Sequence, residues 1–254
     1  MKKTSVYFVG AGPGDPELIT IKGRRLLDTA DVVIYAGSLV NPVLLDGVKA
    51  RIYDSAGMTL DETTAVLIEA AEAAKTAVRL HTGDTSFYSA ISEQIERLRP
   101  LEIGYEVVPG VSSAMAGAAM LGQELTIPEV SQTVIFTRIE GRTPVPAKEG
   151  LADLARHQAS MVIFLSVGMM AQVVGGLNDG GYPPETPVVV VERASWPDQR
   201  VVRGCLNDIA ARVAEAGIKK TALIYIGESL RASERSLGKE SKLYHKDFSH
   251  EFRK

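Results

Sequence analysis

The feature that most constrains the fold is an alternation of short β-branched runs with longer Ala- and Leu-rich runs along a 254-residue chain. The short runs are typical of buried strands and the long runs of amphipathic helices, so their alternation predicts an α/β protein. The predicted strands of the N-terminal half are 6–9, 31–35, 77–81 and 105–108, and its helices 16–29, 63–76, 87–98 and 112–121. Those of the C-terminal half are strands 133–137, 160–165, 187–191 and 221–226, and helices 148–157, 169–179 and 207–216.

The sequence pattern changes between the strand–helix series of the N-terminal half and that of the C-terminal half. Residues 123–131 read Q-E-L-T-I-P-E-V-S and carry little periodicity, which predicts a linker between domains 1–122 and 132–231. Residues 232–254 are polar with mixed charge and, by composition alone, read as a solvated tail. Ligands of α/β folds gather at the carboxyl ends of strands, so the informative loops are those that follow the strands.

Composition excludes several classes of protein. The net charge of -3 does not support wholesale nucleic-acid binding. Cys205 is the one cysteine and the four histidines are scattered, so no intramolecular disulfide and no metal site is predicted. The apolar stretch 6–9 is too short for a signal peptide, and the run 161–176 is interrupted by polar residues, so no membrane span is indicated. A cytoplasmic protein is expected.

The loop after the first predicted strand, G-A-G-P-G-D-P at 10–16, resembles a dinucleotide-binding fingerprint but departs from it. The third glycine of G-x-G-x-x-G would fall at Asp15, whose carboxylate would repel a pyrophosphate. Asp15 suits the N-cap position instead, with Pro16 opening the helix. This loop is therefore either a plain capped turn or a rigid surface for a ligand with little or no phosphate, and an NAD-dependent dehydrogenase is disfavoured.

The loop after the third predicted strand reads H-T-G-D. Gly83 permits close backbone approach, and Asp84 offers a carboxylate to a ligand or only a cap to the next helix. His81 is either a core residue or faces a cleft.

The loop after the fourth predicted strand reads V-P-G-V-S-S-A. Amides at the following helix start could bind a carboxylate, and Ser112 or Ser113 could cap the helix or donate a hydrogen bond. No G-x-S-x-G pattern is present, so a nucleophilic serine is not indicated.

In this order and spacing, G-A-G-P-G-D-P-E-L-I-T, H-T-G-D and V-P-G-V-S-S-A resemble the motifs of the tetrapyrrole (corrin/porphyrin) methylase family. Y-A-G-S-L-V, L-T-I-P, T-R-I-E-G-R-T-P-V-P, W-P-D and the C-terminal S-K-L-Y-H-K-D-F-S-H-E-F-R-K resemble its precorrin-4 and cobalt-precorrin-4 C(11)-methyltransferase branch. The resemblance spans essentially the whole chain. It implies two α/β domains, usually in a homodimer, with S-adenosylmethionine bound in the cleft between them and a methyl group transferred to a tetrapyrrole of cobalamin biosynthesis.

Residue by residue, the resemblance implies the following cofactor-binding positions: Pro13, Thr82, Gly83, Asp84, Phe87, Tyr88, Ser112, Ser113, Leu165, Ala194, Thr221 and Ala222. The chain departs from many relatives at Thr85 and Ser86, which we expect to change loop stiffness and not the identity of the cofactor.

The chemistry of such a reaction asks little of the protein beyond alignment and desolvation, because a sulfonium methyl group is already activated. The substrate carries several carboxylates, which arginines bind well. Arg138, Arg142 and Arg193 follow predicted strands and are candidates, although each could equally be a solvated surface arginine. Three groups are candidates for the base that takes a proton after methylation: Asp15, His81 and Asp84.

Alternatives stay open at this point. Methylation could occur at another tetrapyrrole position, as on uroporphyrinogen III or precorrin-2. A non-catalytic tetrapyrrole carrier would have no need of the cofactor loops, and an RNA ribose methylase would be expected to carry a basic surface. The sequence does not decide whether the substrate contains cobalt.

Overall fold

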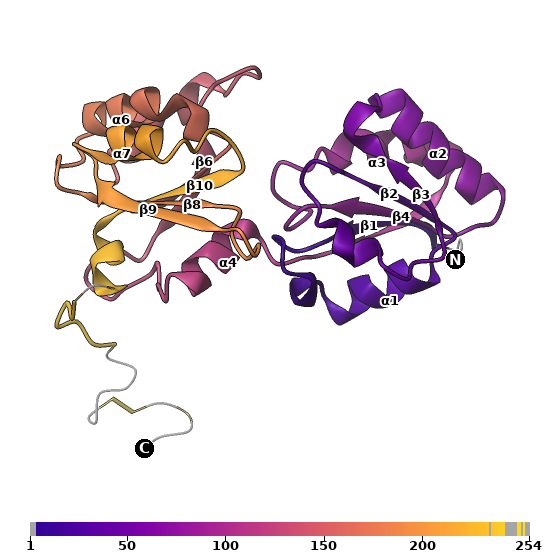
Figure 1. Ribbon diagram of the computed structural model, residues 1–254, viewed down its shortest axis with the longest axis horizontal. Helices are drawn as coiled ribbons and strands as arrows, with labels where there is room; N and C mark the ends of the chain where they lie inside the picture. The colour runs from indigo at the N-terminus through magenta and orange to yellow at the C-terminus, as the bar shows by residue number, and fades with distance from the viewer. Residues whose placement is uncertain (1–3, 234, 242–247, 250, 252–254) are drawn as a thin grey trace. The chain divides into compact units, whose positions relative to one another are not determined.

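A computed structural model of the chain describes residues 4–233, 235–241, 248–249 and 251. The chain divides into two compact units, Met1–Ala116 with Ala194–Asp198, and Gly117–Arg193 with Gln199–Lys254. Each unit is built on one five-stranded sheet with helices, which confirms the α/β class (Figure 1). The predicted limits of domains and linker, and a site between the halves, stay predictions. The predicted tail 232–254 lies partly outside the described residues.

The sheet of the first unit is parallel, with strand order β3-β2-β4-β1-β5. Its strands are β1 (Thr4–Gly10), β2 (Val32–Tyr35), β3 (Arg51–Asp54), β4 (Ala77–His81) and β5 (Gly104–Val108). Its α-helices are α1 (Ile21–Thr29), α2 (Leu60–Glu72) and α3 (Ile91–Leu98), followed by the start of α4 (Ser113–Met120), within which the two units divide. Short 3-10 helices are η1 (Pro16–Leu18), η2 (Pro42–Leu45), η3 (Ser55–Gly57) and η4 (Arg99–Leu101).

Helices cover both faces of this sheet. Leu27 of α1 packs with Val9 and Leu80 on one face, and Leu67 of α2 packs with Leu98 of α3 on the other. Both faces of a doubly covered parallel sheet are buried, which explains why all residues of β4 are buried, Arg79 and His81 included.

Two predicted helices of this unit begin later than the sequence indicated. The predicted helix 16–29 is split, because Asp15 caps the short η1 and Thr20 then caps α1 by accepting a hydrogen bond from the Gly23 amide. The predicted helix 87–98 begins at Ile91, because Tyr88 and Ala90 have positive φ angles, outside the helical region. The edge strand β3 was not predicted.

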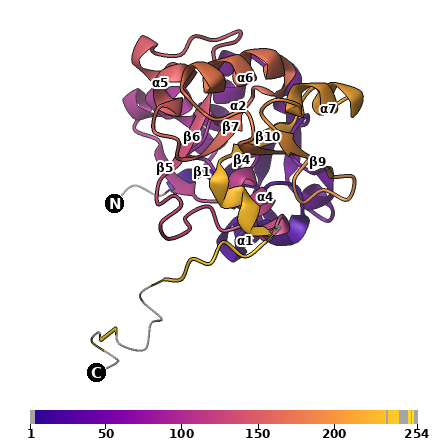
Figure 2. The same cartoon turned by 90° about the vertical axis from the view of Figure 1, so that its left-hand side faces the viewer.

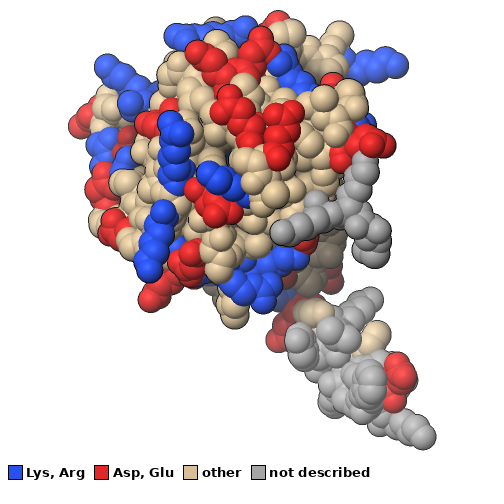
Figure 3. Space-filling model, turned by 90° about the vertical axis from the view of Figure 1, so that its right-hand side faces the viewer, with Lys and Arg blue, Asp and Glu red and all other residues tan. Residues whose placement is uncertain are grey.

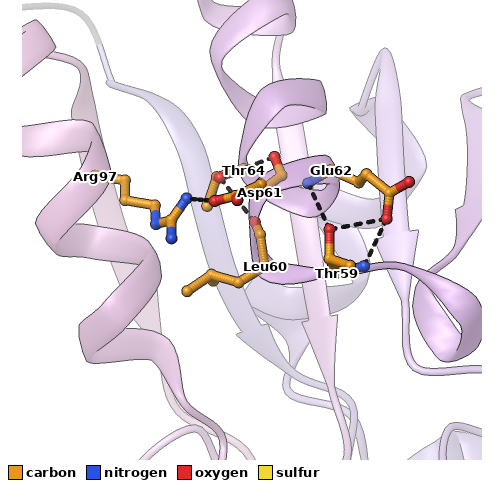
Figure 4. Close-up of polar contacts among 6 residues, drawn as sticks. All are labelled: Thr59, Leu60, Asp61, Glu62, Thr64 and Arg97. Carbon is orange, nitrogen blue, oxygen red and sulfur yellow. Dashed lines mark hydrogen bonds and ion pairs between the residues drawn. The ribbon is translucent and has the colours of Figure 1, made fainter.

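Helix α2 has a complete capping box (Figure 4). The Thr59 hydroxyl accepts a hydrogen bond from the Glu62 amide, and the Glu62 carboxylate accepts one from the Thr59 amide. The Thr59 amide and hydroxyl both donate to the Glu62 carboxylate, and these two hydrogen bonds lower the pKa of Glu62, so the carboxylate is held ionised beside the helix N-terminus. Arg97 of α3 also pairs with Asp61 in the first turn of α2, which links the two helices.

The sheet of the second unit is mixed, with order β6-β7-β10-β8-β9. Its strands are β6 (Val134–Arg138), β7 (Ser160–Phe164), β8 (Pro187–Glu192), β9 (Arg200–Cys205) and β10 (Ala222–Ile226). Its further α-helices are α5 (Leu151–Ala155), α6 (Met170–Asp179) and α7 (Ile209–Glu215), and its 3-10 helices are η5 (Ala147–Glu149), η6 (Val167–Met169) and η7 (Glu228–Ser233). Strands β6 and β7 run parallel, whereas β10 is antiparallel to β7 and β8.

Helices α5, α6 and α7 lie on the same face of this sheet (Figure 2). Each helix contributes a buried side chain to the apolar core over that face: Ala155 from α5, Leu177 from α6 and Val213 from α7. Gly117 of α4 contacts Tyr225 of β10, where an added Cβ would lie 2.1 Å from the Tyr225 hydroxyl. The close approach explains why position 117 of this helix is a glycine.

None of the helices in the described part of the chain is long and apolar enough to cross a membrane.

Candidate active site

Three loops of the first unit meet at the carboxyl edge of its sheet. Strands β4, β1 and β5 are adjacent and parallel, so the loops that follow them emerge side by side. Gly12 and Gly83 form an isolated β-bridge, with N···O distances of 3.2 and 2.8 Å. The Ala11 amide also donates to the His81 carbonyl at 2.7 Å. The first and second predicted site loops are therefore joined through their backbones.

The third loop packs against these two with no room for a side chain. A Cβ added at Gly10 would lie 2.6 Å from the Gly110 nitrogen and 2.7 Å from the Gly83 carbonyl oxygen. A Cβ added at Gly110 would lie 2.2 Å from that same oxygen. We call Gly10, Gly83 and Gly110 the three-glycine junction. Only glycine satisfies this approach at positions 10 and 110.

Asp84 ties the second loop to the third. Its Oδ2 accepts a hydrogen bond from the Gly110 amide and its Oδ1 one from the Ser86 amide, each at 2.8 Å. Partial burial acts to raise the pKa of Asp84, but the hydrogen bonds from Gly110, Ser86 and Thr85 outweigh it and lower the pKa below 3.8. Asp84 is consequently a carboxylate at neutral pH, placed at the junction.

His81 is buried and uncharged. It is 5% exposed, and its ring centroid lies 6.1 Å from that of Phe8 in the core. Burial, and secondarily the charge of the nearby Arg79, lower the pKa of His81 to about 3. Of the two positions left open by the sequence, this environment favours the core.

Asp15 caps η1, as predicted. Its Oδ1 accepts from the Glu17 amide at 2.9 Å, and Pro16 opens the turn. The Thr20 hydroxyl accepts a hydrogen bond from the Gly23 amide at the start of α1. The helix-start amides that a pyrophosphate would need are thus engaged by side chains, which agrees with the argument against a dinucleotide site.

Ser112 and Ser113 stand at the start of α4. Ser112 is buried, its Oγ accepts from the Ala114 amide at 3.3 Å, and it caps the helix. A Cβ added at Gly83 would lie 3.6 Å from the Ser113 nitrogen, so this helix start adjoins the junction. Thr82 is half-buried beside it.

Several predicted site residues have a strained backbone. Ten described non-glycine residues have positive φ angles, and four of them are predicted site positions: Tyr88, Leu165, Arg193 and Thr221. Leu165 is 68% exposed and Tyr88 is 47% exposed. Exposure of such large side chains is unusual in combination with a left-handed backbone. Strain of this kind occurs at ligand sites, but six of the ten residues are not predicted site positions, so the roles of these four stay predictions.

The loops after β8 and before β10 approach each other in the second unit. The Arg193 amide donates to the Thr221 carbonyl at 2.9 Å, and Ala222 pairs with Glu192. Ala222 of β10 is buried and small, as is Ala194, which groups with the first unit. Phe87, in the first unit, is half-buried between Asp84 and the strained Tyr88.

The candidate arginines differ in their surroundings. The guanidinium of Arg138 donates to the carbonyls of Ile139, Thr143 and Pro144 at 3.4, 3.1 and 2.6 Å, so it holds the loop that follows β6. Arg142 is exposed on that loop. Arg193 is half-buried directly after β8.

Three side chains that the sequence analysis did not assign to the site contact the loop after β1. Asn41 Nδ2 donates to the Gly14 carbonyl at 2.8 Å, and Trp196 Nε1 donates to the Pro13 carbonyl at 2.9 Å. Ser195 Oγ accepts from the Asp15 amide at 3.0 Å. The W-P-D motif drew attention to Trp196 in the sequence. The contacts of Ser195 and Trp196, however, join residues 180 or more positions apart, and the local sequence does not indicate them. No cluster of three or more potential metal ligands occurs among the described residues.

The chain was compared with known proteins. It is 57% identical over 251 residues to the cobalt-precorrin-4 C(11)-methyltransferase of Methanocaldococcus jannaschii, covering 98% of this chain and 96% of the relative. It is 48% identical over 250 residues to the precorrin-4 C(11)-methyltransferase of Pseudomonas aeruginosa, covering 98% of each.

Solved structures agree with these relatives. A cobalt precorrin-4 methyltransferase aligns with a TM-score of 0.87 at 45% identity, covering 89% of this chain and 95% of that chain. A uroporphyrin-III C-methyl transferase from Thermus thermophilus, complexed with S-adenyl homocysteine, aligns with a TM-score of 0.75 at 30% identity, covering 90% and 94%. The model of the Tetrapyrrole (Corrin/Porphyrin) Methylases matches residues 5–210. With the three loops of the candidate site lying inside that match, the chain belongs to the tetrapyrrole methylase family.

Proposed function

We propose that the chain is an S-adenosylmethionine-dependent methyltransferase of cobalamin biosynthesis that methylates C(11) of precorrin-4 or cobalt-precorrin-4. The observation that carries the proposal is the high identity, over nearly the whole chain, to enzymes named for that reaction. An organism that makes the metal-free or the cobalt-containing substrate would use the same fold, so both forms belong to the proposal.

The residues of the candidate site suit a cationic, phosphate-free cofactor. Asp84 is ionised and His81 uncharged, so the titratable groups of the junction contribute a negative and not a positive charge. A sulfonium and an ammonium group would be stabilised there. Asp15 and Thr20 engage the helix-start amides that a pyrophosphate would require.

When bound, S-adenosylmethionine supplies an activated methyl group, and the residues of this chain bind and orient it. For that role we propose the positions implied by the family resemblance: Pro13, Thr82, Gly83, Asp84, Phe87, Tyr88, Ser112, Ser113, Leu165, Ala194, Thr221 and Ala222. The three-glycine junction fixes the backbone of three of these loops before the ligand arrives. Preorganisation of this kind reduces the ordering cost of binding and aligns the reacting carbon with the methyl group.

Asp84 is our preferred proton acceptor among Asp15, His81 and Asp84. An acceptor must be unprotonated and accessible, and Asp84 meets both conditions as a half-buried carboxylate. His81 is enclosed in the core. The carboxylates of Asp15 and Asp84 both accept backbone hydrogen bonds, and we prefer Asp84 because it lies at the three-glycine junction.

For substrate carboxylates we propose Arg142 and Arg193 as direct ligands, with Arg138 shaping the loop that carries Arg142. Three of the five N–H donors of Arg138 already bind backbone carbonyls, which leaves two for a carboxylate.

The enzyme is further proposed to be a cytoplasmic homodimer, in keeping with its family.

The test is transfer of a labelled methyl group from S-adenosylmethionine to reconstituted precorrin-4 and cobalt-precorrin-4, followed by mass spectrometry. One label at C(11) of either substrate is the expected result, and the ratio of the two rates assigns the pathway. Cofactor binding without transfer to either, but with transfer to uroporphyrinogen III or precorrin-2, would move the reaction to another tetrapyrrole position. Tetrapyrrole binding without cofactor binding would point to a carrier.

A further inference from the structure

The loop after β1 is held by the segment that follows β8, about 180 residues further along the chain. Trp196 donates from Nε1 to the Pro13 carbonyl at 2.9 Å, and Ser195 Oγ accepts from the Asp15 amide at 3.0 Å. Residues Ala194–Asp198 group by their contacts with the first unit, although the strands on either side of them belong to the second. We call Ser195 and Trp196 the clasp.

Between the two hydrogen bonds, the Trp196 ring lies against Gly14. A Cβ added at Gly14 would lie 2.1 Å from ring carbon Cδ1 and 2.2 Å from Nε1 of Trp196. Three consecutive residues, 13 to 15, are thus contacted by the clasp, by hydrogen bonds at the outer two and by ring packing at the middle one. Asn41 also donates to the Gly14 carbonyl, and Gly83 pairs with Gly12.

The clasp has a conformational cost. Ser195 has a φ of 67° and Arg193, two residues earlier, a φ of 51°, both in the left-handed region that is unfavourable for non-glycine residues. Strain persists where surrounding contacts fix it, and the Ser195 hydroxyl contacts the loop proposed to bind the cofactor. A capped turn alone has no need of a strained partner from so distant a part of the chain.

We propose that Ser195 and Trp196 are positioning residues for the methyl transfer, which hold the backbone of residues 13–15 in the conformation that binds the cofactor. The inference rests on the proposed function, because it takes the loop after β1 as part of the cofactor site. Loss of either hydrogen bond is expected to weaken cofactor binding roughly three- to tenfold while the fold is kept.

The experiment measures the dissociation constant of S-adenosylhomocysteine by calorimetry, with the melting temperature of each protein. Trp196→Phe keeps an apolar ring and removes the donor. Ser195→Gly removes the acceptor and suits the positive φ, whereas Ser195→Asn returns an acceptor oxygen on a residue that tolerates the left-handed region. Ser55→Ala is the matched control, since it removes a serine hydrogen bond to the Tyr35 carbonyl elsewhere in the first unit.

Trp196→Phe and Ser195→Gly are expected to weaken binding, Ser195→Asn to restore it to within about twofold of the parent, and Ser55→Ala to leave it unchanged. Trp196 is the one tryptophan of the chain, so its emission in the parent and in the Ser195 variants is expected to change on saturation with S-adenosylhomocysteine. Parent-like binding by folded Trp196→Phe and Ser195→Gly proteins, or emission unaffected by saturation, would overturn the inference. A parent protein that binds no S-adenosylhomocysteine would overturn the proposed function itself, which the parent titration reveals before any variant is compared.

Discussion

At the scale of single residues, the three-glycine junction is limited by backbone-to-backbone distance. A methyl group at Gly110 would lie 2.2 Å from the Gly83 carbonyl and 2.8 Å from the Gly10 Cα. Both obstacles are backbone atoms, which cannot rotate away as a side chain would. Gly110→Ala is therefore expected to lower the free energy of unfolding by about 3 kcal/mol or more, measured by urea denaturation.

Gly57→Ala in the same unit is the control, because nothing lies within 4 Å of a Cβ added there. Its expected change in unfolding free energy is within about 0.5 kcal/mol. Equal stability of the two variants would mean that the three loops can separate at little cost.

His81 makes stability depend on pH. The pKa of its imidazole falls from 6.5 to about 3 on folding, so between these values the unfolded chain binds more protons than the folded chain. The contribution of the neutral His81 to the free energy of unfolding is therefore fully present above pH 6.5. It declines as the pH falls, by up to roughly 1.4 kcal/mol per pH unit.

His81→Gln removes that titration. Urea denaturation of the parent and the variant between pH 7 and 4.5 is expected to show a shallower decline for the variant. Parallel curves would mean that His81 is solvated and not enclosed in the core.

At the scale of helices and strands, periodicity located the buried elements and missed the exposed ones. The limits of β4 were predicted to the residue from its apolar members Ala77, Val78 and Leu80, although the same buried strand also carries Arg79 and His81. Strands β3 and β9 were missed because each lies at a sheet edge and is largely exposed, so neither carries the apolar pattern.

The candidate site was predictable in part for the same reason. Its loops follow the adjacent strands β4, β1 and β5, and strand ends are where α/β proteins bind ligands. The contact of Gly10 with Gly110 and the clasp on residues 13–15 depend on tertiary approach, for which the local sequence holds no signal. The late start of α3 likewise depends on the positive φ angles of Tyr88 and Ala90, which neither residue type favours.

The capping box of α2 gives a prediction for a whole element (Figure 4). Thr59→Ala removes the hydroxyl that accepts from the Glu62 amide, and is expected to lower the unfolding free energy by about 0.5–2 kcal/mol. Thr59→Ser keeps the hydroxyl and should remain near the parent value in the same urea titration. A serine variant as unstable as the alanine variant would assign the effect to the lost methyl group.

At the scale of the whole molecule, positively and negatively charged residues are nearly equal in number. The chain carries 28 Lys and Arg against 31 Asp and Glu, and on the face seen in Figure 3 the two signs are intermixed. A tetrapyrrole with several carboxylates would therefore be attracted by local arginines and not by the general field of the protein.

This balance predicts how the reaction responds to salt. The KM for the tetrapyrrole should rise with ionic strength, and Arg142→Ala should raise it severalfold at low salt and flatten the dependence, while the dissociation constant of the cofactor stays constant. Arg156→Ala is the control, an exposed arginine on the second unit that pairs with Asp153. The same salt dependence in parent and Arg142→Ala protein would remove Arg142 from the substrate site.

The three-glycine junction also limits how the protein can evolve. A site whose centre is backbone packed on backbone offers no side chain there for selection to alter, and a Cβ added at Gly10 or Gly110 would meet main-chain atoms. New substrate preferences must then arise at the periphery, on segments such as the loop that carries Arg142, where exposed side chains can be exchanged freely. The three-glycine junction is therefore expected to stay unchanged while diversity accumulates around it.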